Sequence, residues 1–226
     1  MDPTSLLESP YIRICIRPRE TIRAIVDRDP RHMVIALVVV GALIGAGTNL
    51  IFSSNPTAFV VGNKPIPMFD PHKWRILSLA SLVIGPLAAI VILYLQGVVL
   101  RWSGALLGGT AKAVEVRAAL GWATIPGIAA NLVITLAGLI FPHSFVPGGG
   151  DPHAMLSQMG QMIPYVAVIV VVLIWATVVS LKCIGEVHRF SAWRALGASL
   201  IGFFAIGGGA LVVAIVVLLV AFPFLK

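Results

Sequence analysis

Five long runs without a charged residue constrain this chain more than any other feature. Each run holds roughly 20 residues or more, enough for a helix rising ~1.5 Å per residue to cross a ~30 Å hydrocarbon layer. Only 11% of the 226 residues are charged, too few to cover a water-soluble domain. We therefore expect an all-α membrane protein with five transmembrane helices in a single domain, with spans near 33–52, 76–100, 118–141, 163–181 and 195–225.

The distribution of Lys and Arg predicts the orientation, because cytoplasmic segments of membrane proteins are enriched in both. The segment 1–32 and the second and fourth loops together hold 12 of the 16 Lys and Arg residues. We expect these parts on the cytoplasmic side of the inner membrane, with the C-terminus outside and no cleaved signal peptide. Cys15 and Cys183 then face a reducing compartment, where no disulfide is expected.

The net charge of +7 follows from this topology and favours contact with anionic lipid headgroups. Nucleic acid is not an expected partner, because no basic patch is interleaved with stacking aromatic residues.

The tripeptide Asp-Pro-His occurs at 70–72 and 151–153, and Asp-Pro recurs at 29–30, each time before an apolar run. Asp caps helix N-termini and Pro fits the first helical turn, so we interpret these copies as helix starts. The alternative is a shared metal or proton site. It would need Asp and His from separate loops to converge, and no pair has the spacing of a helical metal site. We predict no metal and no cofactor.

Residues 17–27 have the pattern of a short amphipathic helix that lies in the inner interface before the first span. Ile22, Ile25 and Val26 fall on one face, opposite Arg19 and Arg23. The preceding segment YIRICIR alternates with period two, and an extended conformation is one interpretation of it. A second short interfacial helix is expected around Met155, Met159 and Met162, before the fourth span.

Several Gly and Pro residues bear on helix packing. Gly41 and Gly45 form a GxxxG pair, which favours close contact between helices. Three glycines at 207–209 should interrupt the fifth helix, and Pro86 and Pro126 should kink the second and third helices.

No Asp, Glu, Lys, Arg or His lies well inside a predicted span, although ion-coupled transporters usually place such groups there. Polar side chains such as Thr135 are interpreted as forming hydrogen bonds between helices. A pore would instead align them in one stripe. No catalytic motif is present, so no catalytic residue is predicted. The candidate polar or kink positions in the membrane are Pro86, Gln96, Trp122, Pro126 and Asn131.

The densest polar motif is KCIGEVHRFSAWRA at 182–195, which predicts a tight turn. Gly185 would end one helix, and Ser191 would cap the next. This motif resembles the last loop of the Yip domain family (Ypt-interacting proteins), in particular its prokaryotic members. RPRETIRAI and GGTAKAVEVRAALGWATIP are similar to further parts of that family. Many members have Tyr four residues before the proline, where this chain has Trp122, so a role of that hydroxyl is absent.

The resemblance implies an integral membrane protein without known catalysis. Eukaryotic relatives act in vesicle traffic and bind small prenylated GTPases and partner subunits. We therefore expect a non-enzymatic scaffold or trafficking-type factor that binds lipid, a protein partner or a second copy of itself at its cytoplasmic face. The alternative is a passive or weakly coupled transporter or channel. The predicted cytoplasmic surface comprises Arg19, Arg23, Lys112, Arg117, Glu186, His188, Arg189, Trp193 and Arg194.

Overall fold

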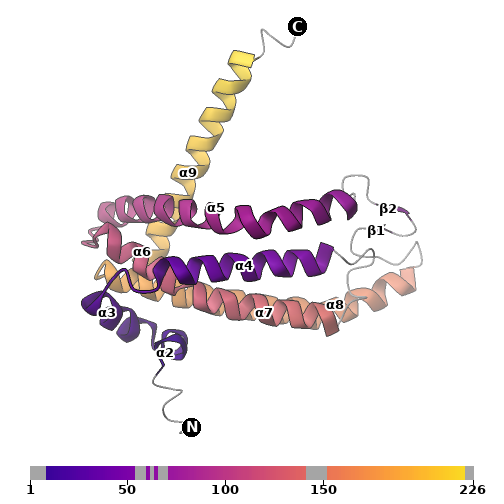
Figure 1. Cartoon of the computed structure of the whole chain (residues 1–226), viewed down its shortest axis with the longest axis horizontal. Coiled ribbons are helices and arrows are strands. Elements are labelled where there is room, and N and C mark those ends of the chain that lie inside the picture. Colours follow the sequence, from indigo (N-terminus) through magenta and orange to yellow (C-terminus); the bar gives the residue numbers. More distant parts are fainter. Residues whose placement is uncertain (1–8, 54–59, 62–63, 66–70, 141–151, 222–226) are drawn as a thin grey trace.

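The computed structural model describes residues 9–53, 60–61, 64–65, 71–140 and 152–221. The described chain is helical apart from turns and one pair of two-residue antiparallel strands (Figure 1). The elements are α2 (Pro10–Ile16), α3 (Pro18–Arg28), α4 (Val34–Ser53), β1 (Val60–Val61), β2 (Lys64–Pro65), α5 (Pro71–Leu106), α6 (Ala113–Trp122), α7 (Thr124–Ile140), α8 (Pro152–Val187) and α9 (Ala192–Ala221).

Helices α4, α5, α7 and α8 lie side by side and form a bundle (Figure 1). Four stretches are long and apolar enough to cross a membrane, and α9 supplies a further apolar helix. The four stretches are Val34–Ile51, His72–Leu106, Ala113–Leu136 and Val166–Val187. The predicted all-α membrane fold is confirmed.

The C-terminal part of α9 stands away from the bundle at a steep angle (Figure 1). The N-terminal part of α9 packs against α5 and α8. The glycines at 207–209 do not interrupt α9, so that expectation is wrong. A Cβ atom added at Gly207 or Gly208 would meet no atom within 4 Å, so these glycines mark a helix without close neighbours in the described chain.

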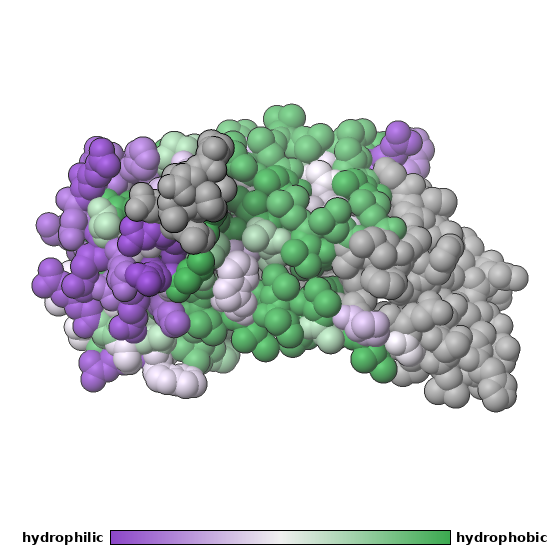
Figure 2. All heavy atoms as spheres, turned by 90° about the horizontal axis from the view of Figure 1, so that it is seen from below, coloured by the Kyte–Doolittle hydropathy of each residue, from purple (hydrophilic) through white to green (hydrophobic). Residues whose placement is uncertain are grey.

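Large apolar side chains cover the outside of the bundle. Val83, Leu87 and Val171 are 71%, 63% and 65% exposed, and Figure 2 shows a broad hydrophobic belt beside a hydrophilic end. Exposing this much apolar surface to water would cost about 25 cal/mol for each Å². The belt is therefore the surface that faces hydrocarbon.

The hydrophilic end carries α2, α3, α6 and the α8–α9 turn, and we call it the basic end. The buried core is concentrated there. Ile14 of α2 and Ile22 of α3 are fully buried, in one cluster with Val116 and Trp122. Burying each such side chain contributes about 1.5–3 kcal/mol, so the two short helices are docked firmly on the bundle.

The short N-terminal helices confirm one expectation and correct another. The predicted amphipathic helix is present as α3, which begins at Pro18 and ends at Arg28. The segment YIRICIR is helical rather than extended, since α2 covers most of it. The period-two pattern does not predict the structure here, because a helix of only 7 residues buries a single side chain, Ile14, and so needs no helical repeat of apolar residues.

Two helices are longer than the apolar runs within them, because a helix can continue past the hydrocarbon into the interface. Helix α5 runs through Pro86 without interruption, and α8 extends from Pro152 to Val187. The short helix expected around Met155, Met159 and Met162 is therefore the first part of α8 rather than a separate element. The third span is divided at Ala123 into α6 and α7, just before Pro126, where the predicted kink falls.

The Asp-Pro copies differ in their outcome. Helices α5 and α8 begin at Pro71 and Pro152, the first-turn position predicted for Pro. The carboxylates of residues 70 and 151 lie outside the described residues. Asp29 does not cap the first membrane helix, which begins at Val34. Its carboxylate accepts a hydrogen bond from the backbone N–H of Arg31 (2.9 Å) and closes a local turn.

Close helix contact occurs at one predicted glycine and at one that was not predicted. A Cβ on Gly41 would make ordinary contact with Ile128 of α7 (3.6 Å), whereas one on Gly45 would meet nothing. A Cβ on Gly121 would lie 3.2 Å from the Val34 Cα atom. The α4–α6 crossing therefore depends on Gly121.

Candidate functional site

At the basic end, α5 terminates in a tight Schellman turn. The Gly109 N–H donates to the Gly104 carbonyl (2.8 Å), and the Gly108 N–H donates to the Ala105 carbonyl (3.0 Å). Gly108 has φ +83°, in the left-handed region where a Cβ atom is costly. Gly108 thus ends this long helix without the strain of a Cβ atom and turns the chain toward α6.

Helix α8 terminates in the same way, but the left-handed residue is Arg189. The Phe190 N–H donates to the Gly185 carbonyl (2.9 Å), and the Arg189 N–H donates to the Glu186 carbonyl (3.1 Å). Arg189 has φ 58°, a conformation that costs a non-glycine residue about 1–2 kcal/mol. The expectation that Gly185 ends this helix is wrong, because Gly185 lies within the last turn of α8.

His188 joins the two helix ends. Its side chain is only 1% exposed and stacks on Phe190, with ring centroids 5.0 Å apart. A Cβ added to Gly104 would lie 2.6 Å from its Nε2 atom, and one added to Gly109 would lie 2.9 Å from its Cγ atom. The His188 carbonyl accepts the Thr110 N–H (3.4 Å). The ring is therefore enclosed by Gly104, Gly109 and Phe190.

Neither ring nitrogen of His188 makes a hydrogen bond of good geometry in the described chain, although the Leu100 carbonyl is close enough to favour the charged ring. Burial lowers the pKa of the imidazole below its ordinary value, because the charged form would lose its hydration. A neutral ring fits this site, and its contacts are those of a packing residue. His188 was predicted as part of an exposed interaction surface, and its burial contradicts that prediction.

A charged groove lies between α3, the start of α6 and the α8–α9 turn, with a volume of about 770 Å³. The Glu186 side chain in its wall is only 12% exposed and forms an ion pair with the Arg23 guanidinium. We call this the charged groove; its lining residues are Arg19, Arg23, Val26, Asp27, Glu115, Glu186, Val187, Arg189, Phe190 and Ser191.

The charged groove brings together four of the predicted surface residues, Arg19, Arg23, Glu186 and Arg189, but it is not the uniformly basic surface that we expected. Its three arginines are matched by the carboxylates of three acidic residues, two of which the sequence analysis did not single out. Glu115 stands three residues after Lys112, the N3 position of a capping box, which is a signal that could have found it. Asp27 carries no comparable signal.

The remaining predicted surface residues lie around the groove rather than in it. Lys112 caps α6, where its backbone N–H donates to the Glu115 carboxylate (2.8 Å). The Arg117 guanidinium lies 4.7 Å from the centre of the Tyr94 ring, a cation–π contact on another side of the bundle. The Ser191 hydroxyl accepts the Arg194 N–H (3.4 Å) and so caps α9 as predicted. Trp193 is 82% exposed, as suits an interfacial anchor.

Trp122 is buried at the base of α2. Its Nε1–H donates to the His32 carbonyl (3.2 Å), and its ring stacks on Tyr11 at 5.5 Å. These contacts join the end of α6 to α2, which precedes α3 in the chain, and to His32, which follows α3. The Trp122 indole therefore helps to hold the N-terminal helices in place.

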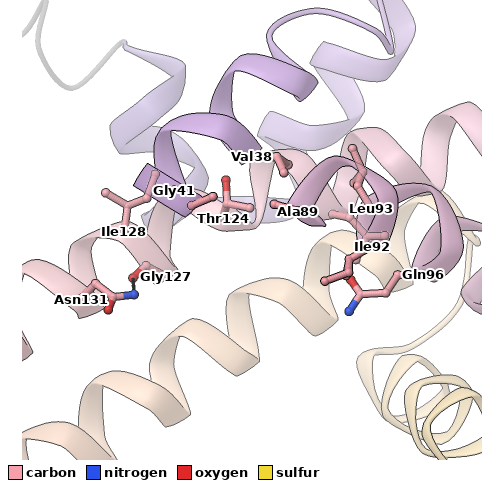
Figure 3. A pocket seen from close by; sticks show the side chains of 12 residues that line it. Val38, Gly41, Ala89, Ile92, Leu93, Gln96, Thr124, Gly127, Ile128 and Asn131 are labelled. Carbon is pink, nitrogen blue, oxygen red and sulfur yellow. Dashed lines mark hydrogen bonds between the residues drawn. The ribbon is translucent and has the colours of Figure 1, made fainter. Parts of the chain in front are cut away.

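A second groove lies within the membrane belt, between α4, α5 and α7, with a volume of about 340 Å³ (Figure 3). Gln96 and Asn131 both line it, amid mostly apolar side chains. Asn131 donates to the Gly127 carbonyl of its own helix (3.2 Å), whereas Thr135 bonds to the Thr48 hydroxyl across to α4 (2.9 Å). The polar groups thus form neither one continuous stripe nor one sealed cluster.

Within the described ranges, no group of three His, Cys, Asp or Glu residues is close enough to hold a metal ion. Both cysteines are free.

Comparison with known proteins agrees with the fold. No curated protein and no solved structure matches the chain. A family model, described as the Yip1 domain, matches residues 12–223, which include every helix that forms the charged groove. The chain is therefore a multi-span membrane protein that belongs to the Yip1 domain family.

Proposed function

We propose that this protein is a non-enzymatic membrane scaffold that binds a protein partner through the charged groove. The observation that carries the proposal is the groove itself, which is large, polar and placed between rigid helix ends at the basic end of the bundle. The Yip1 family is not known for enzymatic activity, which is consistent with a binding role.

The charge pattern favours a protein over a lipid surface as the occupant. Three arginines and three carboxylates line the same groove, so a uniformly anionic membrane surface would meet repulsion as well as attraction. A peptide segment that carries both signs can pair with both. Such complementary patterns contribute mainly specificity and association rate.

The basic end is proposed to face the cytoplasm. The support is the excess of Lys and Arg in the segments that build this end, the asymmetry that usually decides orientation. The expected location is the inner membrane, with the N-terminus inside. A partner would then be a cytoplasmic protein or a cytoplasmic segment of another membrane protein.

The test exchanges the charges of one ion pair. The double variant Arg23→Glu with Glu186→Arg keeps opposite charges side by side and so should keep the fold, but it inverts the pattern that a partner meets. Crosslinking in native membranes followed by affinity purification should recover a defined partner with the unchanged protein and lose it with this variant.

Arg194→Glu is the matched control, because Arg194 is exposed at the same end but outside the groove. The control should retain the partner. Equal loss with the control would mean general electrostatic attraction rather than recognition by the groove. If only further copies of this chain are recovered, the groove serves self-association instead.

The transport alternative is favoured by one observation, the amides of Gln96 and Asn131 on the same membrane groove. A carrier predicts a specific flux in liposomes that Asn131→Leu abolishes and that the groove exchange alters little. The scaffold predicts no such flux. This measurement separates the two functions without knowledge of the partner.

A further inference from the structure

A third pocket lies on the opposite face of α3 from the charged groove, beneath α2. Its volume is about 430 Å³, and the residues that decide its chemistry are Arg13, Ile25, Arg28, Asp29, His32 and Trp122. We call it the α2–α3 pocket. It combines a cationic rim with an aromatic and aliphatic base.

The rim carries more positive than negative charge. Arg28, in the last turn of α3, forms no ion pair with any described residue. Arg13 approaches Glu20 at 4.0 Å, but Glu20 is shared with Arg17 at 3.7 Å, so one carboxylate serves two guanidinium groups. The Asp29 carboxylate lines the same pocket and accepts the Arg31 N–H, so it offsets part of this charge. Two guanidinium groups and one carboxylate leave the pocket with a net positive charge, which favours an anionic occupant.

The base of the pocket fits the apolar part of a lipid. Trp122 and Ile25 lie below the arginines, and α2 exposes Ile12 and Ile16, which are 38% and 65% exposed. Exposed isoleucines on a short helix beside a bilayer belt indicate that α2 reaches the acyl boundary. The arginines of the same pocket then lie at headgroup depth.

We propose that the α2–α3 pocket binds the phosphate of an anionic phospholipid, with Arg13 and Arg28 as its ligands and Trp122 and Ile25 against the glycerol and upper acyl chain. Guanidinium groups pair with phosphate oxygens through two parallel hydrogen bonds, which makes arginine well suited to this task. The occupant is a membrane lipid and not a free anion, because the base is apolar. This proposal does not depend on the partner proposed for the charged groove.

The test uses Trp122 as its own reporter. Trp74, Trp102, Trp175 and Trp193 are replaced by Phe in the full chain, which is placed in phosphatidylcholine vesicles. Phosphatidylglycerol with acyl chains brominated near the glycerol is then added. Trp122 is almost fully buried but lines the pocket, and bromine quenches tryptophan over a short distance, so the titration should reveal a saturable site. Brominated phosphatidylcholine should quench Trp122 far less.

Arg13→Gln combined with Arg28→Gln should weaken this site by about tenfold or more, since each lost charge-assisted contact is of that order. Arg101→Gln combined with Arg194→Gln removes the same charge from exposed positions at the basic end outside the pocket and should leave the site unchanged. Arg13→Lys with Arg28→Lys should fall between. Thermal unfolding confirms that each variant is folded.

Three outcomes would overturn the proposal. Equal weakening by both glutamine pairs would mean that the basic end attracts anionic lipid without a specific site. Equal quenching by both brominated lipids would mean that Trp122 merely touches the bilayer. Displacement of the brominated lipid by dilute inorganic phosphate would assign the pocket to a soluble anion.

Discussion

Replacing Gly104 by Ala tests the enclosure of His188 most sharply. In an open helix this change should stabilise by about 1 kcal/mol, because glycine is the poorer helix former. Here the new Cβ atom would lie 2.6 Å from Nε2 and 2.8 Å from Nδ1 of a buried ring that Phe190 holds from its other side. Overpacking of this kind costs about 1–3 kcal/mol. We expect a net destabilisation of about 0–2 kcal/mol.

The same change should reverse its sign once the ring is removed. His188→Ala alone leaves a cavity, and we expect it to cost about 1–3 kcal/mol, because the loss of packing is partly offset by the loss of two unpaired ring nitrogens. In that background Gly104→Ala meets no imidazole and should stabilise by about 1 kcal/mol. The coupling between the two sites should therefore be on the order of 2 kcal/mol.

Reversible unfolding in mixed micelles, followed by tryptophan fluorescence, measures the four free energies of this cycle. Gly45→Ala is the control, because Gly45 lies inside α4 and a Cβ atom there would meet nothing within 4 Å. Additive effects of Gly104→Ala and His188→Ala, within about 0.5 kcal/mol, would refute the packing described for the two helix ends.

Three further predictions use the same unfolding assay. Arg189→Gly should stabilise the protein by about 0.5–1 kcal/mol, because glycine adopts φ 58° without strain; destabilisation would contradict the described α8 end. Burial lowers the pKa of His188, so as pH falls the unfolded chain binds a proton at this residue before the folded chain does. Stability should therefore decrease as pH drops through about 6.5, by at most ~1.4 kcal/mol per pH unit. His188→Ala should remove that part of the pH dependence, and an unchanged pH dependence would show that the ring is solvated. Thr135→Val should cost about 0.6–1.7 kcal/mol by breaking its bond to the Thr48 hydroxyl, whereas Thr177→Val, which loses a bond within its own helix, should cost less; equal costs would refute that bond.

The membrane fold was predictable from the sequence because hydrocarbon imposes one strong requirement, a long run without charge. Helix ends were less predictable, because helices do not stop where hydrocarbon stops. Arg75 and Lys182 mark the ends of apolar runs, yet Arg75 lies inside α5 and Lys182 lies inside α8. The division at Ala123 followed from Pro126, since proline removes a backbone donor and so marks a break in the sequence itself.

The end of α8 shows where local rules fail. Glycine is the usual residue at a helix end, so Gly185 was expected there, but the left-handed position falls on Arg189 four residues later. Burial of His188 between Gly104 and Gly109 fixes this register, and those contacts join residues more than 70 positions apart. No pattern within the turn itself carries that information.

The candidate site was predicted in location but not in character. Counting Lys and Arg located the charge at one end of the bundle, and four of the named residues do line one groove. The acidic partners lie on three separate helices, so only the fold brings them opposite the arginines. The α2–α3 pocket escaped prediction for the same reason, because Arg13, Arg28 and Trp122 meet only after α2 packs beneath α3.

Site-directed photocrosslinking from the charged groove tests the central claim most directly. A photoreactive phenylalanine analogue replaces Val26, which lines the groove and carries no charge, and in a second variant it replaces Lys73, which is exposed near the start of α5. Illumination of native membranes should give a discrete adduct with a second protein from position 26 and none from position 73. The adduct should vanish when Arg23→Glu and Glu186→Arg are introduced together. An adduct that survives this exchange, or the same adduct from both positions, would contradict a partner site in the charged groove.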